Sequence, residues 1–185
     1  MPFSSKSARP RAFLTEPALY DYAVKALGRQ MRTESDLRRL ISTRVAPDAA
    51  GEAAVRSVIA CLKDHGYLND KSFAETYARL RKENEKLGER RVRNDLRQKG
   101  VRADVIEEAV AARYSETSEE ALARDYLSRK RIPKPESPKD TARVMRRLVG
   151  AGFSTGTIYK ILRRWDVPEE SLAALENLDT DPHEE

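Results

Sequence analysis

The sequence predicts an all-α protein built from three tandem three-helix bundles, and three observations support this fold class. Apolar residues recur at helical spacing in almost every segment, as in residues 158–165, and runs of alternating β-branched residues are absent. Gly66, Gly100 and Gly152 each follow a helical stretch and precede an apolar residue, which is typical of glycines just beyond the C-terminus of a helix. The third observation is an internal repeat.

The repeat becomes visible when residues 92–110 are superposed on residues 144–162, at an offset of 52 positions. The matching pairs are Val92 with Val144, Leu96 with Leu148, Gly100 with Gly152, Val101 with Phe153, Ile106 with Ile158 and Val110 with Leu162. Upstream, the helix that contains Tyr77 matches the helix that contains Tyr126 at an offset of 49. We therefore expect three extra residues in the third repeat, within the Pro-rich stretch 132–138.

A fainter first copy precedes these two repeats. Its three expected helices carry Tyr22 and Ala23, then Leu37 and Ile41, then Val55, Ile59 and Leu62. A unit of this size buries its apolar stripes best by packing on a neighbour. The predicted organisation is a disordered basic tail over residues 1–15, helical repeats over residues 16–69, 70–117 and 118–167, and an acidic tail over residues 168–185. We expect the repeats to form an elongated monomer.

Local signals agree with these boundaries. Ser154 has the side chain of a good N-cap at the start of the last helix, and Asn69 or Asp70 can cap the helix that opens the second repeat. Arg102 occupies the position equivalent to Ser154 and is a poor capping residue, so the start of that helix is less well defined by its sequence.

Charge is distributed unevenly along the chain. All 35 basic residues lie within residues 1–165, which hold 22 acidic residues, whereas residues 166–185 hold eight acidic side chains and no basic ones. The first part of the chain is therefore far more basic than the overall net charge of +5 suggests. Such a field attracts polyanions and acidic surfaces.

Several function classes find no support in the residues. No segment approaches 18 uncharged apolar residues and residues 1–11 lack the apolar core of a secretory signal, so we expect a soluble cytoplasmic protein without membrane association. Cys61 is the single cysteine, and we expect it to be a buried thiol rather than part of a disulfide or metal site. No phosphate-binding glycine loop or catalytic constellation is evident around His65 or His183. The sequence predicts neither an enzyme nor a cofactor.

Residues 66–101 carry a more specific pattern. The residues Gly66-Tyr67-Leu68-Asn69-Asp70, Phe73-Ala74, Gly88, Arg90-Arg91-Val92-Arg93, Leu96-Arg97 and Lys99-Gly100-Val101 together resemble the hallmark region of the RecX family. The resemblance implies three tandem three-helix repeats and a non-catalytic regulator that lies in the groove of the RecA–DNA filament. Such a regulator depresses filament growth, strand exchange and ATP hydrolysis in DNA repair and the SOS response. The implied partners are the RecA filament and, as a contributory partner, single-stranded or filament-bound DNA.

Two departures from the family pattern affect mainly the first repeat and its boundary. Asn69 stands where an acidic residue is common in the family, and residues 42–50 look like an insertion in place of a short glycine turn.

The helix expected over residues 89–99 offers candidate binding residues. Its apolar residues face inward, which leaves three arginines at i, i+3 and i+7 on another face. Guanidinium groups suit phosphates and carboxylates because each offers a planar fork of donors. The alternative is a solvated face paired with local carboxylates. The candidates are Arg90, Arg93 and Arg97.

The third repeat has the strongest basic density in the chain, and a binding role for some of its residues is predicted there. The candidates are Arg143, Arg146 and Arg147 on one helix and Lys160, Arg163 and Arg164 on the next. The aromatic residues Phe73, Tyr77, Tyr126 and Trp165 are expected to pack rather than to stack on bases.

Two alternatives stay open. An autonomous DNA-binding protein of the helix-turn-helix type is disfavoured, because the basic residues are dispersed rather than concentrated on one recognition helix. The acidic residues 166–185 are expected to solubilise a basic protein, or to fold back over the basic surface of residues 143–164 and compete with phosphate.

Overall fold

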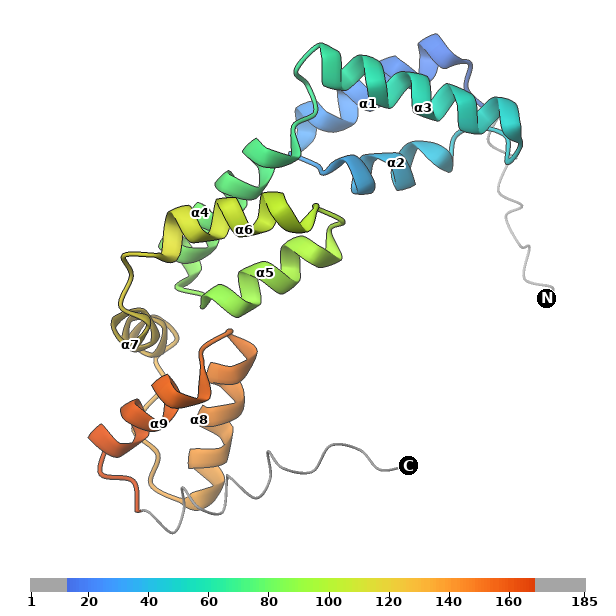
Figure 1. Ribbon diagram of the computed structural model, residues 1–185. Helices are drawn as coiled ribbons and strands as arrows, with labels where there is room; N and C mark the ends of the chain where they lie inside the picture. Colours follow the sequence, from blue (N-terminus) through green and yellow to red (C-terminus); the bar gives the residue numbers. More distant parts are fainter. Residues whose placement is uncertain (1–12, 169–185) are drawn as a thin grey trace, which may run out of the picture. The chain divides into compact units, whose positions relative to one another are not determined.

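The structure is a computed structural model that describes residues 13–168, and the regular structure in this range is helical throughout (Figure 1). The helices are α1 (Glu16–Arg29), α2 (Glu34–Ser42), α3 (Ala49–Asp64), α4 (Asp70–Glu85), α5 (Glu89–Gln98), α6 (Ala103–Tyr114), α7 (Glu119–Arg129), α8 (Pro138–Gly150) and α9 (Thr155–Arg164). The predicted all-α fold class is confirmed. Most of each predicted tail lies outside the described residues.

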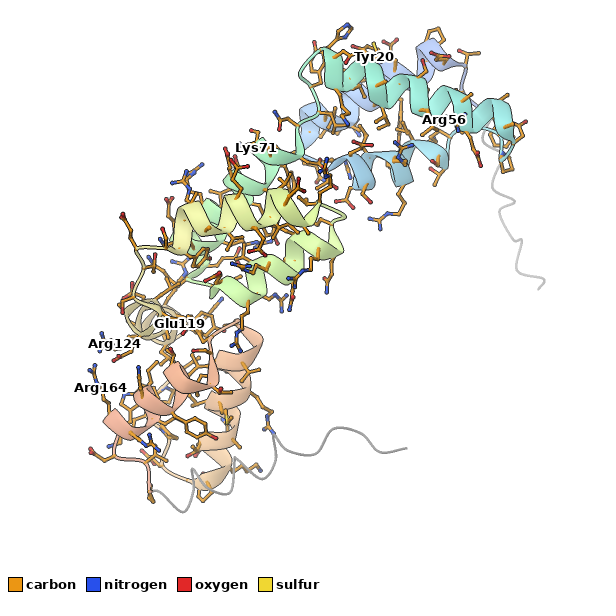
Figure 2. All side chains as sticks on the ribbon, in the orientation of Figure 1. Tyr20, Arg56, Lys71, Glu119, Arg124 and Arg164 are labelled. Carbon is orange, nitrogen blue, oxygen red and sulfur yellow. The ribbon has the colours of Figure 1, made fainter. Side chains whose placement is uncertain are left out.

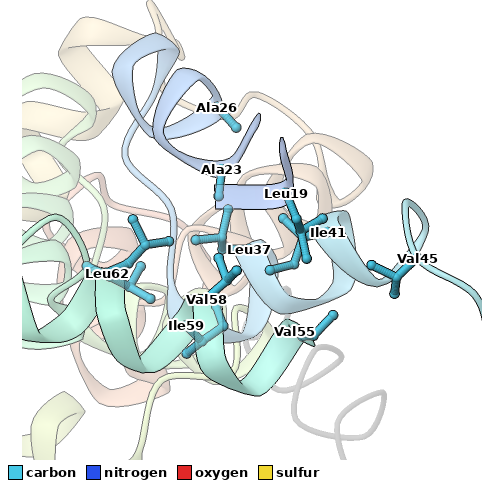
Figure 3. Packing of buried hydrophobic residues seen from close by; sticks show 11 residues of the cluster. Leu19, Ala23, Ala26, Leu37, Ile41, Val45, Val55, Val58, Ile59 and Leu62 are labelled. Atoms are coloured by element: carbon cyan, nitrogen blue, oxygen red, sulfur yellow. The ribbon is translucent and has the colours of Figure 1, made fainter. Parts of the chain in front are cut away.

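Within the described residues the chain divides into two compact units. The first contains residues 13–73 together with residues 99–101, and the second contains residues 74–98 and 102–168. Helices α1, α2 and α3 of the first unit surround one apolar core (Figure 3). Its fully buried side chains include Leu19, Ala23, Leu37, Ile41 and Leu62. The apolar spacing that predicted the faint first repeat therefore corresponds to a real three-helix core.

In the second unit the superposed residue pairs occupy equivalent buried positions. Val92 and Leu96 of α5 are 0 % exposed, and Val144 and Leu148 of α8 are 4 % and 0 % exposed. The remaining apolar members are also buried, namely Ile106 and Val110 of α6, Ile158 and Leu162 of α9, and Val101 and Phe153 in the turns. The sequence repeat thus reflects one packing scheme used twice.

The predicted helix caps are present. The Asn69 side chain accepts a hydrogen bond of 3.0 Å from the Ser72 amide, and Ser154 Oγ accepts one of 3.3 Å from the Thr157 amide. Arg102 makes no capping hydrogen bond, in agreement with its poor capping chemistry. Each side-chain cap satisfies one amide that the first turn of a helix leaves without an intrahelical partner.

The three glycines that follow helices adopt the left-handed conformation expected of them. Their φ angles are 73° at Gly66, 74° at Gly100 and 92° at Gly152, in a region that residues with a Cβ rarely enter. Two of these turns have a second role, because each brings backbone close to the start of another helix.

In the first unit, the turn formed by residues 99–101 lies against the N-terminus of α2. Thr33 Oγ1 donates a hydrogen bond of 2.6 Å to the carbonyl of Lys99. A Cβ on Gly100 would lie 2.4 Å from the Cβ of Ser35, so only glycine fits there. The Thr33 side chain, which is 0 % exposed, therefore both caps α2 and holds this turn.

In the second unit, the turn between α8 and α9 lies in the same way against the N-terminus of α5. The Gly88 amide donates a hydrogen bond of 2.8 Å to the carbonyl of Ala151. A Cβ on Gly152 would lie 2.3 Å from the backbone nitrogen of Arg91. The two turns are equivalent in the sequence repeat, so both units use one kind of junction, with a hydroxyl donor in one and a backbone amide in the other.

Some of the residues expected to pack in a core lie only at its edge. Phe73 is buried as predicted, but Tyr77 is half-buried and its hydroxyl donates to Asp95 at 3.0 Å. Tyr126 is half-buried against the ring of Phe153, with ring centroids 5.8 Å apart. Trp165 is also half-buried. These rings cover core edges and keep their polar atoms near solvent.

The prediction of a buried Cys61 thiol is wrong, since the residue is half-buried. Its sulfur lies 3.8 Å from Nδ1 of His65, one helical turn further along, and the Tyr20 hydroxyl is 2.8 Å from the same nitrogen. The helical spacing that placed Cys61 near apolar residues did not distinguish the core face of α3 from its edge.

Candidate nucleic-acid interface

The arginines predicted on α5 do not share one environment. Arg90 and Arg97 are exposed, while the Arg93 side chain is 24 % exposed. Arg97 Nη1 donates a hydrogen bond of 3.0 Å to the side-chain oxygen of Asn94, one turn earlier. Arg97 forms no ion pair among the described residues. The structure therefore places two of the three predicted arginines where a polyanion can reach them.

Arg93 instead joins α5 to α6. Its guanidinium forms ion pairs with Glu89 on its own helix and with Glu107 on α6, and Nε donates 2.9 Å to Glu89. Burial opposes the charged form of this side chain, but the two carboxylates outweigh that effect and hold the pKa of Arg93 above its ordinary value. Its charge is thus largely compensated within the repeat.

A groove of about 380 Å³ lies beside the contact between α5 and the turn that joins α8 to α9. Its lining includes Arg90, Arg91, Asn94, Gln98 and Val149, together with the carboxylate of Asp95. Val149 is 47 % exposed and is one of the large apolar side chains that the fold leaves on the surface. The groove combines guanidinium and amide donors with an apolar edge, which is a suitable lining for a phosphate backbone or for an acidic segment of a protein.

Sequence reasoning overlooked Arg91 and Val149. Arg91 Nε forms an ion pair with Asp95 at 2.9 Å, and Arg91 Nη1 donates a hydrogen bond of 3.4 Å to the carbonyl of Gly150. The offset of 52 positions superposes Val149 on Arg97, so the repeat register could have indicated that Val149 occupies an exposed position.

On α8, the predicted residues Arg143, Arg146 and Arg147 are all exposed, because the apolar residues of this helix face α9 and the core. Arg143 pairs with Asp140 at 2.7 Å. Among the described residues no ion pair involves Arg146 or Arg147. No carboxylate of the described residues therefore occupies these two guanidiniums.

On α9, Lys160, Arg163 and Arg164 are exposed as predicted. Arg164 Nη1 lies 2.5 Å from Glu120 Oε1, and Arg124 Nη1 donates a hydrogen bond of 3.2 Å to the same oxygen. Figure 2 labels the two arginines. Glu120 is therefore shared by two guanidiniums, which leaves local positive charge in excess around α7 and α9.

The first repeat differs in its charge balance. Residues 16–70 hold eight basic and eight acidic side chains, whereas residues 115–165 hold twelve and six. Arg39 pairs with Asp36 at 2.7 Å, and Arg56 lies 3.8 Å from Glu52. The uncompensated positive charge of the described residues thus lies mainly in the second and third repeats.

A second basic groove, of about 440 Å³, lies beside α8. The Pro-rich loop forms one wall with Pro133, Lys134 and Pro135, and α8 forms the other with Arg143, Val144 and Arg147. Glu136 and Asp140 also reach this groove. Sequence reasoning identified the arginines of this site but not its enclosure by the loop.

Within residues 13–168, no group of three His, Cys, Asp or Glu side chains could hold a metal ion. None of the helices in this range has the length and apolar character needed to cross a membrane.

Comparison with known proteins identifies one family. The model of the domain described as "RecX, second three-helix domain" matches residues 69–110. The chain is 34% identical over 153 residues to the regulatory protein RecX of Mycolicibacterium vanbaalenii, which covers 81% of this chain and 80% of that protein. It is 33% identical over 148 residues to the regulatory protein RecX of Deinococcus radiodurans, with 79% and 67% covered.

A solved structure agrees in fold. The crystal structure of RecX from Lactobacillus salivarius superposes with a TM-score of 0.61 at 22% sequence identity, covering 82% of this chain and 96% of that chain.

Proposed function

This chain belongs to the RecX family of regulatory proteins, and from that premise we propose that it binds the RecA–DNA filament and restrains the recombinase. Restraint here means slower ATP hydrolysis, strand exchange and filament growth. The observation that carries the proposal is the exposure of basic side chains on α5, α8 and α9. Its accessible members are Arg90, Arg97, Arg143, Arg146, Arg147, Lys160, Arg163 and Arg164.

A surface of this kind suits DNA held within a protein filament. Basic side chains release counterions from DNA when they contact phosphates, and this supplies affinity without reading sequence; Arg97, Arg146 and Arg147 can do so without breaking an ion pair among the described residues. The groove beside α5 adds amide donors and the exposed Val149, which extend recognition to a protein surface. We therefore assign the protein a mixed target of phosphate and protein rather than a DNA sequence.

Restraint of RecA then follows if this chain binds one state of the filament more tightly than another, and this chain itself need not catalyse a chemical step. A ligand shifts an equilibrium between two states only through its different affinities for them. A tenfold preference for the filament state that hydrolyses ATP slowly corresponds to about 1.4 kcal/mol.

The test measures RecA ATP hydrolysis on single-stranded DNA with and without this protein, together with binding of the protein to the same DNA alone. We expect hydrolysis to fall at protein concentrations well below those that coat free DNA. Equal concentrations for the two effects would instead support an autonomous DNA-binding protein. The double variant Arg90→Ala and Arg97→Ala should weaken the inhibition.

A matched control removes the same charge elsewhere. The double variant Arg39→Ala and Arg56→Ala deletes two exposed arginines of the first repeat that already have carboxylate neighbours. Inhibition should be almost unchanged in this control. An equal loss in both double variants would mean that total charge, rather than the α5 surface, determines binding.

A further inference from the structure

The groove between the Pro-rich loop and α8 has a basic and an apolar component. Lys134, Arg143 and Arg147 supply positive charge, while the exposed Pro133 and the half-buried Ile132 supply apolar surface. Arg131 reaches the groove as well, so the basic side chains of the lining outnumber its two acidic ones, Glu136 and Asp140. A ligand that fits both components carries carboxylates or phosphates together with apolar groups.

The end of the described chain lies at this groove. After α9 the backbone turns back, with the Val167 amide bonded to the Leu162 carbonyl at 3.3 Å and the Val167 side chain buried. Asp166 then pairs with Lys134 of the Pro-rich loop at 3.6 Å. The chain is therefore already in ionic contact with one wall of the groove two residues before Pro168, where the described residues end.

The sequence that follows is complementary to the groove. We define the acidic segment as residues 169–185, which contain seven carboxylate side chains and no lysine or arginine. Leu172, Leu175 and Leu178 recur within it at three-residue spacing. At about 3.3 Å per extended residue, a segment of this length spans about 55 Å at most, which greatly exceeds the roughly 6 Å rise between Arg143 and Arg147 on α8.

From this complementarity we infer that the acidic segment of the same chain occupies the groove between the Pro-rich loop and α8. Its carboxylates pair with Lys134, Arg143 and Arg147, and its leucines cover the apolar wall. Because the segment is tethered beside the groove, its effective concentration there is in the millimolar range, so weak contacts suffice. The occupied groove is then closed to other anions until they displace the segment.

The contact is tested on the full chain by NMR, without DNA or RecA, so that the result is independent of the proposed function. Backbone amide spectra of the wild type are compared with those of a variant whose seven carboxylates become amides, through Glu169→Gln, Glu170→Gln, Glu176→Gln, Asp179→Asn, Asp181→Asn, Glu184→Gln and Glu185→Gln. Outside the substituted segment, the expected differences are confined to the loop and the exposed face of α8. They are present at about 0.01 M salt and lost at about 1 M, where charges are screened within about 3 Å.

Two further variants localise the contact. In Arg143→Gln with Arg147→Gln, the spectral difference between wild-type and amide segments should disappear, whereas in Arg146→Gln with Lys160→Gln, two exposed cations that do not line the groove, it should persist. Identical groove resonances with both segments, or differences that survive the Arg143 and Arg147 substitutions, would overturn the inference. Differences that grow with protein concentration would place the segment in the groove of a second copy and would also overturn it.

Discussion

The backbone amide of Gly88 donates a hydrogen bond of 2.8 Å to the carbonyl of Ala151, and this contact joins the start of α5 to the turn between α8 and α9. A Cβ on Gly88 would lie 2.4 Å from the carbonyl oxygen of Gly152 and 3.0 Å from the Phe153 nitrogen. Both neighbours are backbone atoms in a tight turn, so they cannot move aside as the end of a flexible side chain can. The absence of a side chain at Gly88 is therefore required by this junction.

Gly88→Ala should destabilise the protein, because the new methyl group forces the two backbones apart and weakens the hydrogen bond. Overpacking of this kind costs about 1–3 kcal/mol. Urea unfolding followed by circular dichroism measures the loss. The control is Gly150→Ala, since no atom lies within 4 Å of a Cβ built there. If both variants unfold at the same urea concentration, the close approach at Gly88 does not exist in solution.

On α5, the ion-paired Arg93 and the exposed Arg97 should differ in their contribution to the free energy of unfolding. Arg93→Ala should lower the free energy of unfolding by about 1 kcal/mol because it removes the link to Glu107 on α6. Arg97→Ala should change it by less than about 0.5 kcal/mol. Chemical denaturation of the two variants provides the measurement. An Arg93→Ala variant as stable as the wild type would show that the ion pairs contribute nothing to the fold.

For binding to the RecA–DNA filament, Arg97 should matter more than Arg93. Arg93→Met replaces a half-buried cation with the residue type that the third repeat has at the equivalent position, Met145. This variant should bind almost as well as the wild type. Arg97→Ala should weaken binding and reduce the slope of log affinity against log salt by about one, as expected for one lost phosphate contact. Filament affinities measured at several salt concentrations would contradict this if Arg93→Met lost more than Arg97→Ala.

Glu119 gives the second unit a dependence on acid pH. Burial opposes its ionisation, but the Ser154 amide at 2.7 Å and the hydroxyls of Ser154 and Thr157 favour the carboxylate, and together they hold its pKa below the usual 4.5. The stability that it contributes is therefore fully present above pH 4.5 and is lost as the pH falls through the lowered value.

Glu119→Gln should consequently flatten the acid limb of the stability curve. Below pH 4.5 the wild type should lose stability more steeply than the variant, because the variant has no carboxylate to protonate at this site. The control Glu116→Gln removes an exposed carboxylate nearby and should leave the wild-type slope unchanged. If stability falls with pH equally steeply in the wild type and in Glu119→Gln, the Glu119 carboxylate does not contribute to the acid dependence.

The sequence predicted the helices and their ends because the signals for them are local. Apolar spacing, a capping side chain at Ser154 and a glycine at Gly152 act within a few residues of one another. The junction between Gly88 and Ala151 was not predictable in the same way, because the two residues lie far apart in sequence and the donor is a backbone atom. Only the repeat register, which relates the turns at Gly100 and Gly152, pointed in that direction.

The exposure of most candidate residues was predictable from helical spacing, and the different environment of Arg93 has a physical cause. Helical spacing tells which residues avoid the core but not which carboxylates come from another helix, so Arg93 was grouped with Arg90 and Arg97 although Glu107 of α6 compensates its charge. The same offset that superposes Val92 on Val144 superposes Arg93 on the buried Met145. Applying the repeat to every position, rather than to the apolar ones alone, would have separated Arg93 from the exposed arginines.

The acidic segment should oppose binding to bare DNA more than binding to the filament. If it occupies the groove beside α8, phosphates must displace it before they reach Arg143 and Arg147, whereas a filament also offers protein contacts elsewhere. The variant with seven amides should then bind single-stranded DNA about tenfold more tightly at low salt, a difference of about 1.4 kcal/mol. The difference should shrink as salt rises, because exposed charges are screened within about 10 Å at 0.1 M.

A gain in affinity alone would also follow from the higher net charge of the amide variant, so a double-mutant cycle is needed to separate the two effects. Arg143→Gln with Arg147→Gln should weaken DNA binding strongly in the amide background, where these guanidiniums are free to contact phosphates. The same pair should weaken it little in the wild type, where the acidic segment already holds them. Arg146→Gln with Lys160→Gln, two exposed cations that do not line this groove, should cost the same affinity in both backgrounds. Equal losses for the Arg143 and Arg147 pair in the two backgrounds would show that the segment acts through net charge only and does not compete for this groove.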